Sequence, residues 1–310
     1  MNVFTTVQLH SEGHNDRLIR TELETGDLTR LRRGGYTSER PPTSEQRHRL
    51  LLESTRDRLG TATVVSHTSA ALLHGWPVPP ASLDRVTCTR EREPTGGGNV
   101  SSWLHAYAGA LPDDAVTEID GFRVTSPART AADASRLLPR DDAVAMLDAA
   151  LRLSRSGENE ALRLAVTEQL RADARKHGAR RARLALGLAS GLAESPVESR
   201  SRLAFHDHGI PEPVLQFRVI DAFGRVVAIT DFAWPDHGVV GEVDGRVKYE
   251  SLLRPGERAS DALVREKRRE NDIQALGWVV FRWFPDDLAN PAVLCSRLRR
   301  LLDGRMTRIG

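Results

Sequence analysis

The stretch ITDFAWPDHGVVGEVDGRVKY, residues 229–249, constrains the fold more than any other part of the sequence. Two apolar runs flank the short segment 235–238, which contains a proline and a glycine. Apolar runs separated by a short turn of this kind predict two antiparallel strands. If Trp234 lies opposite Val239, the same register places Asp231 opposite Glu242, with Cβ atoms about 5 Å apart.

Two carboxylates opposite each other on adjacent strands are unfavourable unless a positive charge lies between them. Asp244 is two residues beyond Glu242, so strand alternation places it on the same face. A divalent cation with oxygen ligands is the simplest source of that charge, and we expect Asp231 and Glu242 to be its ligands. A slip of one residue would separate the acids, so the prediction depends on the register. The alternative is a surface hairpin whose acids are solvated.

A metal ion held by carboxylates suits phosphodiester hydrolysis, because it activates water and neutralises charge on the phosphate. A lysine nearby can stabilise the charge of the transition state. Lys248, six residues after Glu242, is the first candidate, and Lys267 on the following helix is the second. The expected ion is Mg²⁺, or Mn²⁺ in its place.

The elements around this hairpin predict a C-terminal domain over residues 193–310. Ser195, Pro196 and Glu198 have the pattern of a helix start, with a cap, a first-turn proline and a capping-box acid. Three antiparallel strands, a helix at about residues 261–276, a buried strand and a closing helix follow. This order predicts a mixed sheet flanked by helices. On the 261–276 helix, Lys267, Arg268 and Arg269 are candidates for phosphate contacts, and pairing with acids at helical spacing on a solvated face is the alternative.

Residues 1–60 predict a winged-helix domain, because two short helices precede a basic hairpin. Asn15 has the position of a helix cap, Gly26 that of a helix stop, and Gly34 lies in the hairpin turn. The second helix of a helix-turn-helix enters the major groove of DNA. We therefore expect five arginines to contact bases or phosphates, namely Arg17 and Arg20 on the helix and Arg30, Arg32 and Arg33 on the hairpin. A winged helix used only for protein packing is the alternative.

Residues 61–153 predict a middle α/β domain, and residues 154–192 predict a helical connector. The middle segment has four strand patterns, and Asp120-Gly121 is a strong hairpin signal between the last two. The connector is rich in arginine, and we interpret its charges as a solvated helix face. The whole chain is thus expected to have a mixed α/β (α+β) fold.

Composition restricts the class of protein. The net charge is only +2, and the two cysteines, Cys88 and Cys295, lie far apart without any CxxC pair. This excludes a disulfide framework and fits a reducing compartment. No apolar run approaches the ~18 residues that a membrane span needs. We expect a cytoplasmic protein that is not bound to a membrane.

Four features of the C-terminal segment follow one another along the chain. They are Glu198 on a capped helix, Asp231 in DFAW, then EVDG and EKRRENDIQALGWVVFRW. This order is typical of one nuclease family. Over about residues 190–305 the chain resembles the very-short-patch-repair-endonuclease-like branch of the PD-(D/E)xK nucleases. The resemblance implies that Asp231 and Glu242 are metal ligands, that Glu198 is a supporting acid, and that Asp244 or Lys248 serves near the lysine position. The family's signature has lysine where this chain has Asp244. Either Lys248 replaces it, or the nuclease is weakened or inactive.

Three motifs of the N-terminal half, LTRLRRGGYTS, SHTSAALLHGWPV and VTSPARTAADASRLL, resemble antitoxin-type regulators of the AbiEi family. The resemblance covers about residues 1–150 and implies a transcriptional autoregulator or antitoxin of a phage-defence toxin–antitoxin pair. The first functional hypothesis is therefore that the chain binds DNA and hydrolyses its phosphodiester bonds with a metal-dependent endonuclease domain. The alternative is a non-catalytic AbiEi-type regulator with a toxin partner and a degenerate nuclease fold. The sequence leaves the recognised DNA and the oligomeric state open.

Overall fold

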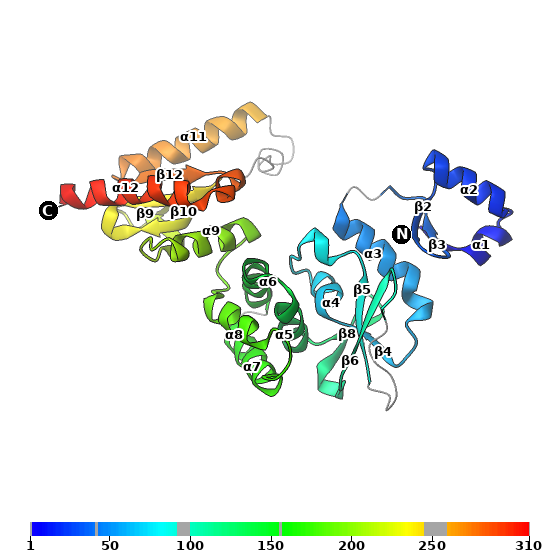
Figure 1. The fold of residues 1–310 in the computed structure, drawn as a ribbon. Coiled ribbons are helices and arrows are strands. Elements are labelled where there is room, and N and C mark those ends of the chain that lie inside the picture. The colour runs from blue at the N-terminus through cyan, green and yellow to red at the C-terminus, as the bar shows by residue number, and fades with distance from the viewer. Residues whose placement is uncertain (1, 41–42, 92–99, 155–156, 245–258, 310) are drawn as a thin grey trace. The chain divides into compact units, whose positions relative to one another are not determined.

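The structure is a computed structural model that describes residues 2–40, 43–91, 100–154, 157–244 and 259–309. The chain divides into two compact units, Met1–Gly187 and Leu188–Gly310 (Figure 1). Helices account for 51% and strands for 21% of the structure, which confirms the predicted mixed α/β class. Among the described residues, none of the helices is long and apolar enough to cross a bilayer. The finer division into four segments stays a prediction.

The first unit begins with two short helices and a three-stranded sheet. The elements are β1 (Val3–Thr5), α1 (Thr6–Ser11), α2 (Asp16–Thr25), β2 (Thr29–Arg32) and β3 (Gly35–Thr37). The side chain of Asn15 accepts the Leu18 N–H at 2.9 Å and caps α2, and Gly26 ends it with a φ of 79°. The small core consists of Leu9, Ile19, Leu28 and Tyr36. The helices and hairpin follow the predicted winged-helix order, and β1 adds a third strand, next to β3, that the sequence pattern does not predict.

Helix α3 (Ser44–Thr55) leads into a five-stranded sheet with the order β6-β5-β4-β8-β7. The strands are β4 (Thr63–Val65), β5 (Val86–Arg90), β6 (Leu104–Ala108), β7 (Val116–Ile119) and β8 (Phe122–Thr125). Asp120 and Gly121 have φ values of 52° and 72° and make the predicted tight turn between β7 and β8. Strand β4, at the centre of the sheet, is the one that the sequence pattern does not predict.

Five helices complete the first unit. They are α4 (His67–Leu73), α5 (Pro127–Leu137), α6 (Arg140–Leu153), α7 (Asn159–Ala172) and α8 (Ala179–Leu188). Helix α5 packs against α4, α6 and α7. Although α7 and α8 lie in the segment predicted as a connector, the first compact unit includes α7 and all but the last residue of α8.

The second unit has the predicted order of elements around a four-stranded mixed sheet. They are α9 (Pro196–Asp207), β9 (Val214–Ile220), β10 (Val226–Trp234), β11 (Val239–Val243), α11 (Ala259–Ala275), β12 (Val279–Trp283) and α12 (Pro291–Ile309). The sheet order is β12-β11-β10-β9. Strands β11 and β12 are parallel and the other pairs are antiparallel.

Helices cover both faces of this sheet. On one face, Phe205 of α9 and Leu298 of α12 join a cluster with Phe232, Trp234 and Trp283. On the other face, Ile273 of α11 packs against Ala233 and Val240. The strand aromatics Phe232, Trp234 and Trp283 are therefore core residues. Because successive side chains of a strand alternate in direction, β11 and β12 point every second residue toward α11.

Candidate functional site

Four of the five arginines predicted to contact DNA are exposed. Arg17 and Arg20 lie on α2, Arg30 on β2 and Arg33 at the β2–β3 turn. Arg30 also lies over the ring of Tyr36, with 5.8 Å between its guanidinium carbon and the ring centroid. On the hairpin, Arg30 and Arg33 give a local positive charge that suits phosphate contacts.

Arg32 differs from the other four because it is only 5% exposed. Its guanidinium donates from Nε to the Ser54 carbonyl at 2.9 Å and from Nη1 to the Arg33 carbonyl at 3.0 Å. Burial is the main factor that lowers its pKa, and nearby Arg58 acts in the same direction. The structure thus places Arg32 as a link between the hairpin and α3, with its N–H groups engaged inside the protein.

The β10–β11 hairpin has the predicted register. Trp234 pairs with Val239, and Phe232 pairs with Gly241. The two strands are joined by a single turn of 3₁₀ helix, Pro235–His237. Continuing this register by one residue places Asp231 opposite Glu242. Oδ2 of Asp231 accepts the N–H of Val243 at 2.9 Å, so this carboxylate closes the end of the β10–β11 ladder.

Two arginines neutralise Glu242, which is 8% exposed. Its Oε1 lies 2.7 Å from Nη2 of Arg269 on α11, and its Oε2 lies 3.1 Å from Nη2 of Arg282 on β12. Glu242 and Arg282 are register partners on parallel strands and point to the same face. The positive charge that the sequence argument requires beside Glu242 is therefore present, and it comes from two guanidinium groups.

The same two arginines hold two further acids, so that five side chains form one network. Arg269 bonds Glu266 at 2.7 Å and 3.0 Å, as the alternative helical pairing predicts. Arg282 bonds Glu266 at 2.7 Å and Glu270 at 2.9 Å. Burial opposes the charge of both arginines, but these carboxylates raise the pKa of each. The hydrogen bonds from Arg269 are the main factor that lowers the pKa of Glu266.

Glu198 is buried at the start of α9 and takes part in its cap. Its Oε1 accepts the Ser195 hydroxyl at 2.8 Å, and its Oε2 accepts the Glu194 N–H at 2.7 Å. Burial is the main factor that raises the pKa of Glu198, and the Asp231 carboxylate adds to this effect. Glu198 is thus close enough to Asp231 to feel its charge, while its own oxygens are bonded locally.

The remaining predicted site residues are Asp244, Lys248, Lys267 and Arg268. Asp244 is half-buried directly after β11, and its backbone N–H donates to the Trp283 carbonyl at 2.8 Å. Lys248 lies outside the described residues. Lys267 and Arg268 are exposed on α11, whereas their neighbour Arg269 is directed to Glu242. Lys267 and Arg268 therefore remain accessible for the predicted phosphate contacts.

The predicted metal ligands do not fit a Mg²⁺ site in this arrangement. Mg²⁺ needs carboxylate oxygens aimed at one octahedral centre. Both oxygens of Glu242 bond guanidinium groups, and one oxygen of Asp231 bonds a backbone amide. Within the described parts of the chain, no group of three or more His, Cys, Asp or Glu side chains is placed to hold a metal ion.

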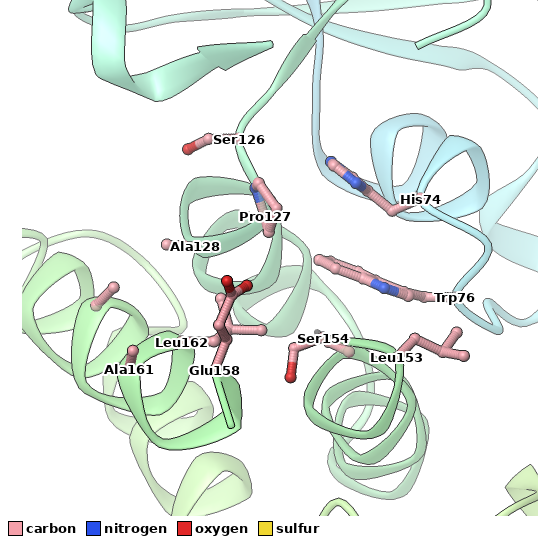
Figure 2. Close-up of a pocket in the computed structure, with 12 residues that line it drawn as sticks. His74, Trp76, Ser126, Pro127, Ala128, Leu153, Ser154, Glu158, Ala161 and Leu162 are labelled. Carbon is pink, nitrogen blue, oxygen red and sulfur yellow. The ribbon is translucent and has the colours of Figure 1, made fainter. Parts of the chain in front are cut away.

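The first unit contains a pocket of about 480 Å³ between the ends of four helices (Figure 2). His74 and Trp76, with ring centroids 4.8 Å apart, are stacked along one side, and the opposite side includes Ser126, Glu158 and Leu162. Nε2 of His74 donates to the Thr125 carbonyl at 2.9 Å, and burial lowers the pKa of this histidine. A pocket of this size with mostly apolar walls is in the range of small-molecule sites.

A buried charge network lies on helix α5 of the same unit. Asp133 is fully buried and accepts hydrogen bonds from Arg129 at 2.6 Å and from Arg136 at 2.5 Å. His67, at the start of α4, stacks on Tyr107 with 3.9 Å between ring centroids. Burial lowers the pKa of His67 to about 4, although the charge of Asp133 acts in the opposite direction.

The chain is similar to one known protein family and to two mycobacterial proteins. Residues 62–187 match the family described as the AbiEi antitoxin C-terminal domain. Two uncharacterized proteins of Mycobacterium tuberculosis, Rv2248 of strain H37Rv and MT2308 of strain CDC 1551, are each 36% identical over 205 residues, which cover 66% of this chain and 69% of each relative. The chain belongs to the family of these mycobacterial proteins.

The crystal structure of the RV2827C protein from Mycobacterium tuberculosis matches with a TM-score of 0.37 and 18% identity, over 65% of this chain and 75% of that one. The AbiEi-like domain, residues 62–187, ends at the same residue as the first compact unit. The family match confirms the AbiEi-like part of the predicted resemblance, but over residues 62–187 in place of about 1–150, and the nuclease-like part stays a prediction.

Sequence reasoning did not find the pocket or the buried network of the AbiEi-like domain. The signals are nevertheless in the predicted motifs. SPARTAAD supplies Arg129 and Asp133 at a spacing of four residues on one helix, and LHGW supplies His74 and Trp76. Because such residues are common on helices and in turns, only their burial distinguishes them.

Proposed function

We propose that this protein is a DNA-binding regulator of the AbiEi antitoxin type, which controls its own expression and binds a toxin as its protein partner. One observation carries the proposal: the AbiEi-like domain follows a winged-helix-type element within a single compact unit. The AbiEi-like domain supports the toxin partner, and the winged helix supports DNA as the second partner.

The hairpin is the best supported part of the DNA surface. Arg30 and Arg33 are exposed on this hairpin, which corresponds to the wing of a winged helix. Arginine side chains are common partners of DNA phosphates. Arg17 and Arg20 are also exposed on α2, and so is Glu24. Glu24 is seven residues, or about two helical turns, after Arg17 and therefore lies on the same side of the helix. Its negative charge weakens the attraction of that helix face for phosphates.

DNA binding is tested by titrating the full chain onto duplex DNA from upstream of its own coding sequence, at several salt concentrations. A plot of log K against log salt has a negative slope, and we expect the Arg30→Gln/Arg33→Gln variant to make it less steep by about 0.9 for each lost phosphate contact. Arg85→Gln, which removes an exposed charge elsewhere in the same unit, is the control and should leave the slope unchanged. Equal slopes for all three proteins would exclude the hairpin as the DNA surface.

The toxin partner is tested by co-expression with the protein encoded next to this one. We expect the neighbouring protein to inhibit growth when it is expressed alone and the full chain to restore growth. Growth that is unaffected by the neighbour, or inhibition that the full chain does not relieve, would contradict an antitoxin role for this pair.

Metal-dependent DNA cleavage by the C-terminal unit is the second candidate function. The β10–β11 register favours it, because the register brings Asp231 close to Glu242. We consider cleavage less well supported than the regulatory function, because guanidinium groups contact both oxygens of Glu242. Cleavage of plasmid and single-stranded DNA with Mg²⁺ or Mn²⁺ by the wild type, lost in Asp231→Ala/Glu242→Ala, would establish it. Salt-sensitive DNA binding without cleavage would exclude the nuclease activity and support the regulatory function.

A further inference from the structure

We infer that Arg269 and Arg282 are permanent counter-ions of Glu242, in the place where the nuclease resemblance implies a divalent metal ion. The C-terminal unit then keeps its charge balance and its fold without a metal. The inference concerns a different unit from the winged helix and is independent of the proposed regulatory function.

Each oxygen of Glu242 has its own arginine. Oε1 is 2.7 Å from Arg269, and Oε2 is 3.1 Å and 3.2 Å from two nitrogens of Arg282. The 2.7 Å contact with Arg269 has the length of a charge-assisted hydrogen bond, which is the strong class. A Mg²⁺ ion about 2.1 Å from either oxygen would lie beside a guanidinium group, and like charges repel strongly where solvent is largely excluded.

The two arginines are held in place from the other side as well. Arg282 is in the strand register opposite Glu242 and also bonds Glu266 and Glu270 of α11. Arg269 bonds Glu266 on its own helix, and that helix is packed on the sheet through Ile273. To free Glu242 for a metal ion, both arginines would have to move away from it while their other carboxylates hold them where they are.

The network also has a structural effect that a metal site on the hairpin alone would not have. It joins β11 and β12 to α11 through the bonds of Arg269 and Arg282. Breaking a largely buried ion pair by removing one partner leaves the other charge without compensation and destabilises the fold. Glu242 should therefore matter for the stability of the metal-free protein.

The test is thermal unfolding of the full chain, with EDTA and with millimolar Mn²⁺. We compare the wild type with Glu242→Gln and with Asp236→Asn, which neutralises an exposed acid in the turn before β11. We expect Glu242→Gln to lower the unfolding midpoint of the C-terminal unit in EDTA, and Asp236→Asn to leave it unchanged. Mn²⁺ should raise the midpoint of none of the three proteins.

A midpoint that rises with Mn²⁺ in the wild type, and no longer does so in Glu242→Gln or Asp231→Asn, would overturn the inference. If Glu242→Gln does not fold, Arg269→Gln replaces it. The inference then requires Arg269→Gln to be less stable than the wild type in EDTA, and equal stability would refute it. DNA binding by the winged helix, measured on the same proteins, separates this result from the proposed function.

Discussion

Acid should destabilise the first unit through His48, a fully buried histidine on α3. Its Nδ1 donates to the Leu83 carbonyl at 2.7 Å, because a carbonyl can only accept. With a pKa of about 4 the ring is neutral near pH 7, so its Nε2 accepts the Ser69 hydroxyl at 2.9 Å. Burial is the main factor that lowers the pKa of His48 from 6.5 to about 4.

The direction in which stability changes with pH follows from the number of protons bound by the folded and unfolded states. Below pH 6.5 the unfolded chain protonates this histidine, whereas the folded protein keeps it neutral until about pH 4. Since the unfolded state binds more protons in this window, the free energy of unfolding falls as the pH falls through it. A difference of about 2.5 between the two pKa values corresponds to about 3 kcal/mol. His67, whose pKa is also lowered to about 4, adds a loss of the same sign.

The assay is urea unfolding of the first unit at a series of pH values between about 7 and about 4.5. We expect His48→Gln, which keeps a donor and an acceptor but does not titrate, to lose less stability than the wild type over this range, by about 2 kcal/mol. His177→Gln removes an exposed histidine of the same unit and should behave as the wild type does. The same pH dependence in His48→Gln and the wild type, or an NMR titration of His48 near its usual pKa, would show that His48 is not the source of the acid sensitivity.

Three substitutions test the packing and capping arguments by the free energy of unfolding. Gly241→Ala should cost about 1–3 kcal/mol, since its new Cβ would lie 3.0 Å from the ring of Trp283; an unchanged stability would contradict the packing of that face. Asp133→Ala should cost about 3–5 kcal/mol by leaving two buried arginines without their carboxylate, and a loss under about 1 kcal/mol would show that it is dispensable. Thr43→Ala should cost about 1 kcal/mol through loss of the α3 cap, whereas Ser44→Ala should be nearly neutral.

Local patterns predicted the elements well where the signal lies within a few residues. Asn15 caps α2, Asp120 and Gly121 turn the β7–β8 hairpin, and Trp234 pairs with Val239, as their neighbours in the sequence indicate. Strands β1 and β4 escaped prediction because each has only three residues, too few to show a period. Such short strands are stabilised by their partners in the sheet rather than by their own sequence.

The sequence predicted that Asp231 and Glu242 lie together with a positive charge beside them, and it left a hairpin with solvated acids as the alternative. Alternation, turn length and the repulsion of like charges are local properties, and they support that prediction once the register is given. The cation that supplies this charge depends on the packing of distant elements. Arg282 is 40 positions from Glu242 in the sequence, and it comes opposite only when β12 pairs in parallel with β11. The same holds for His48, whose pKa depends on burial by distant elements that no pattern around it reveals.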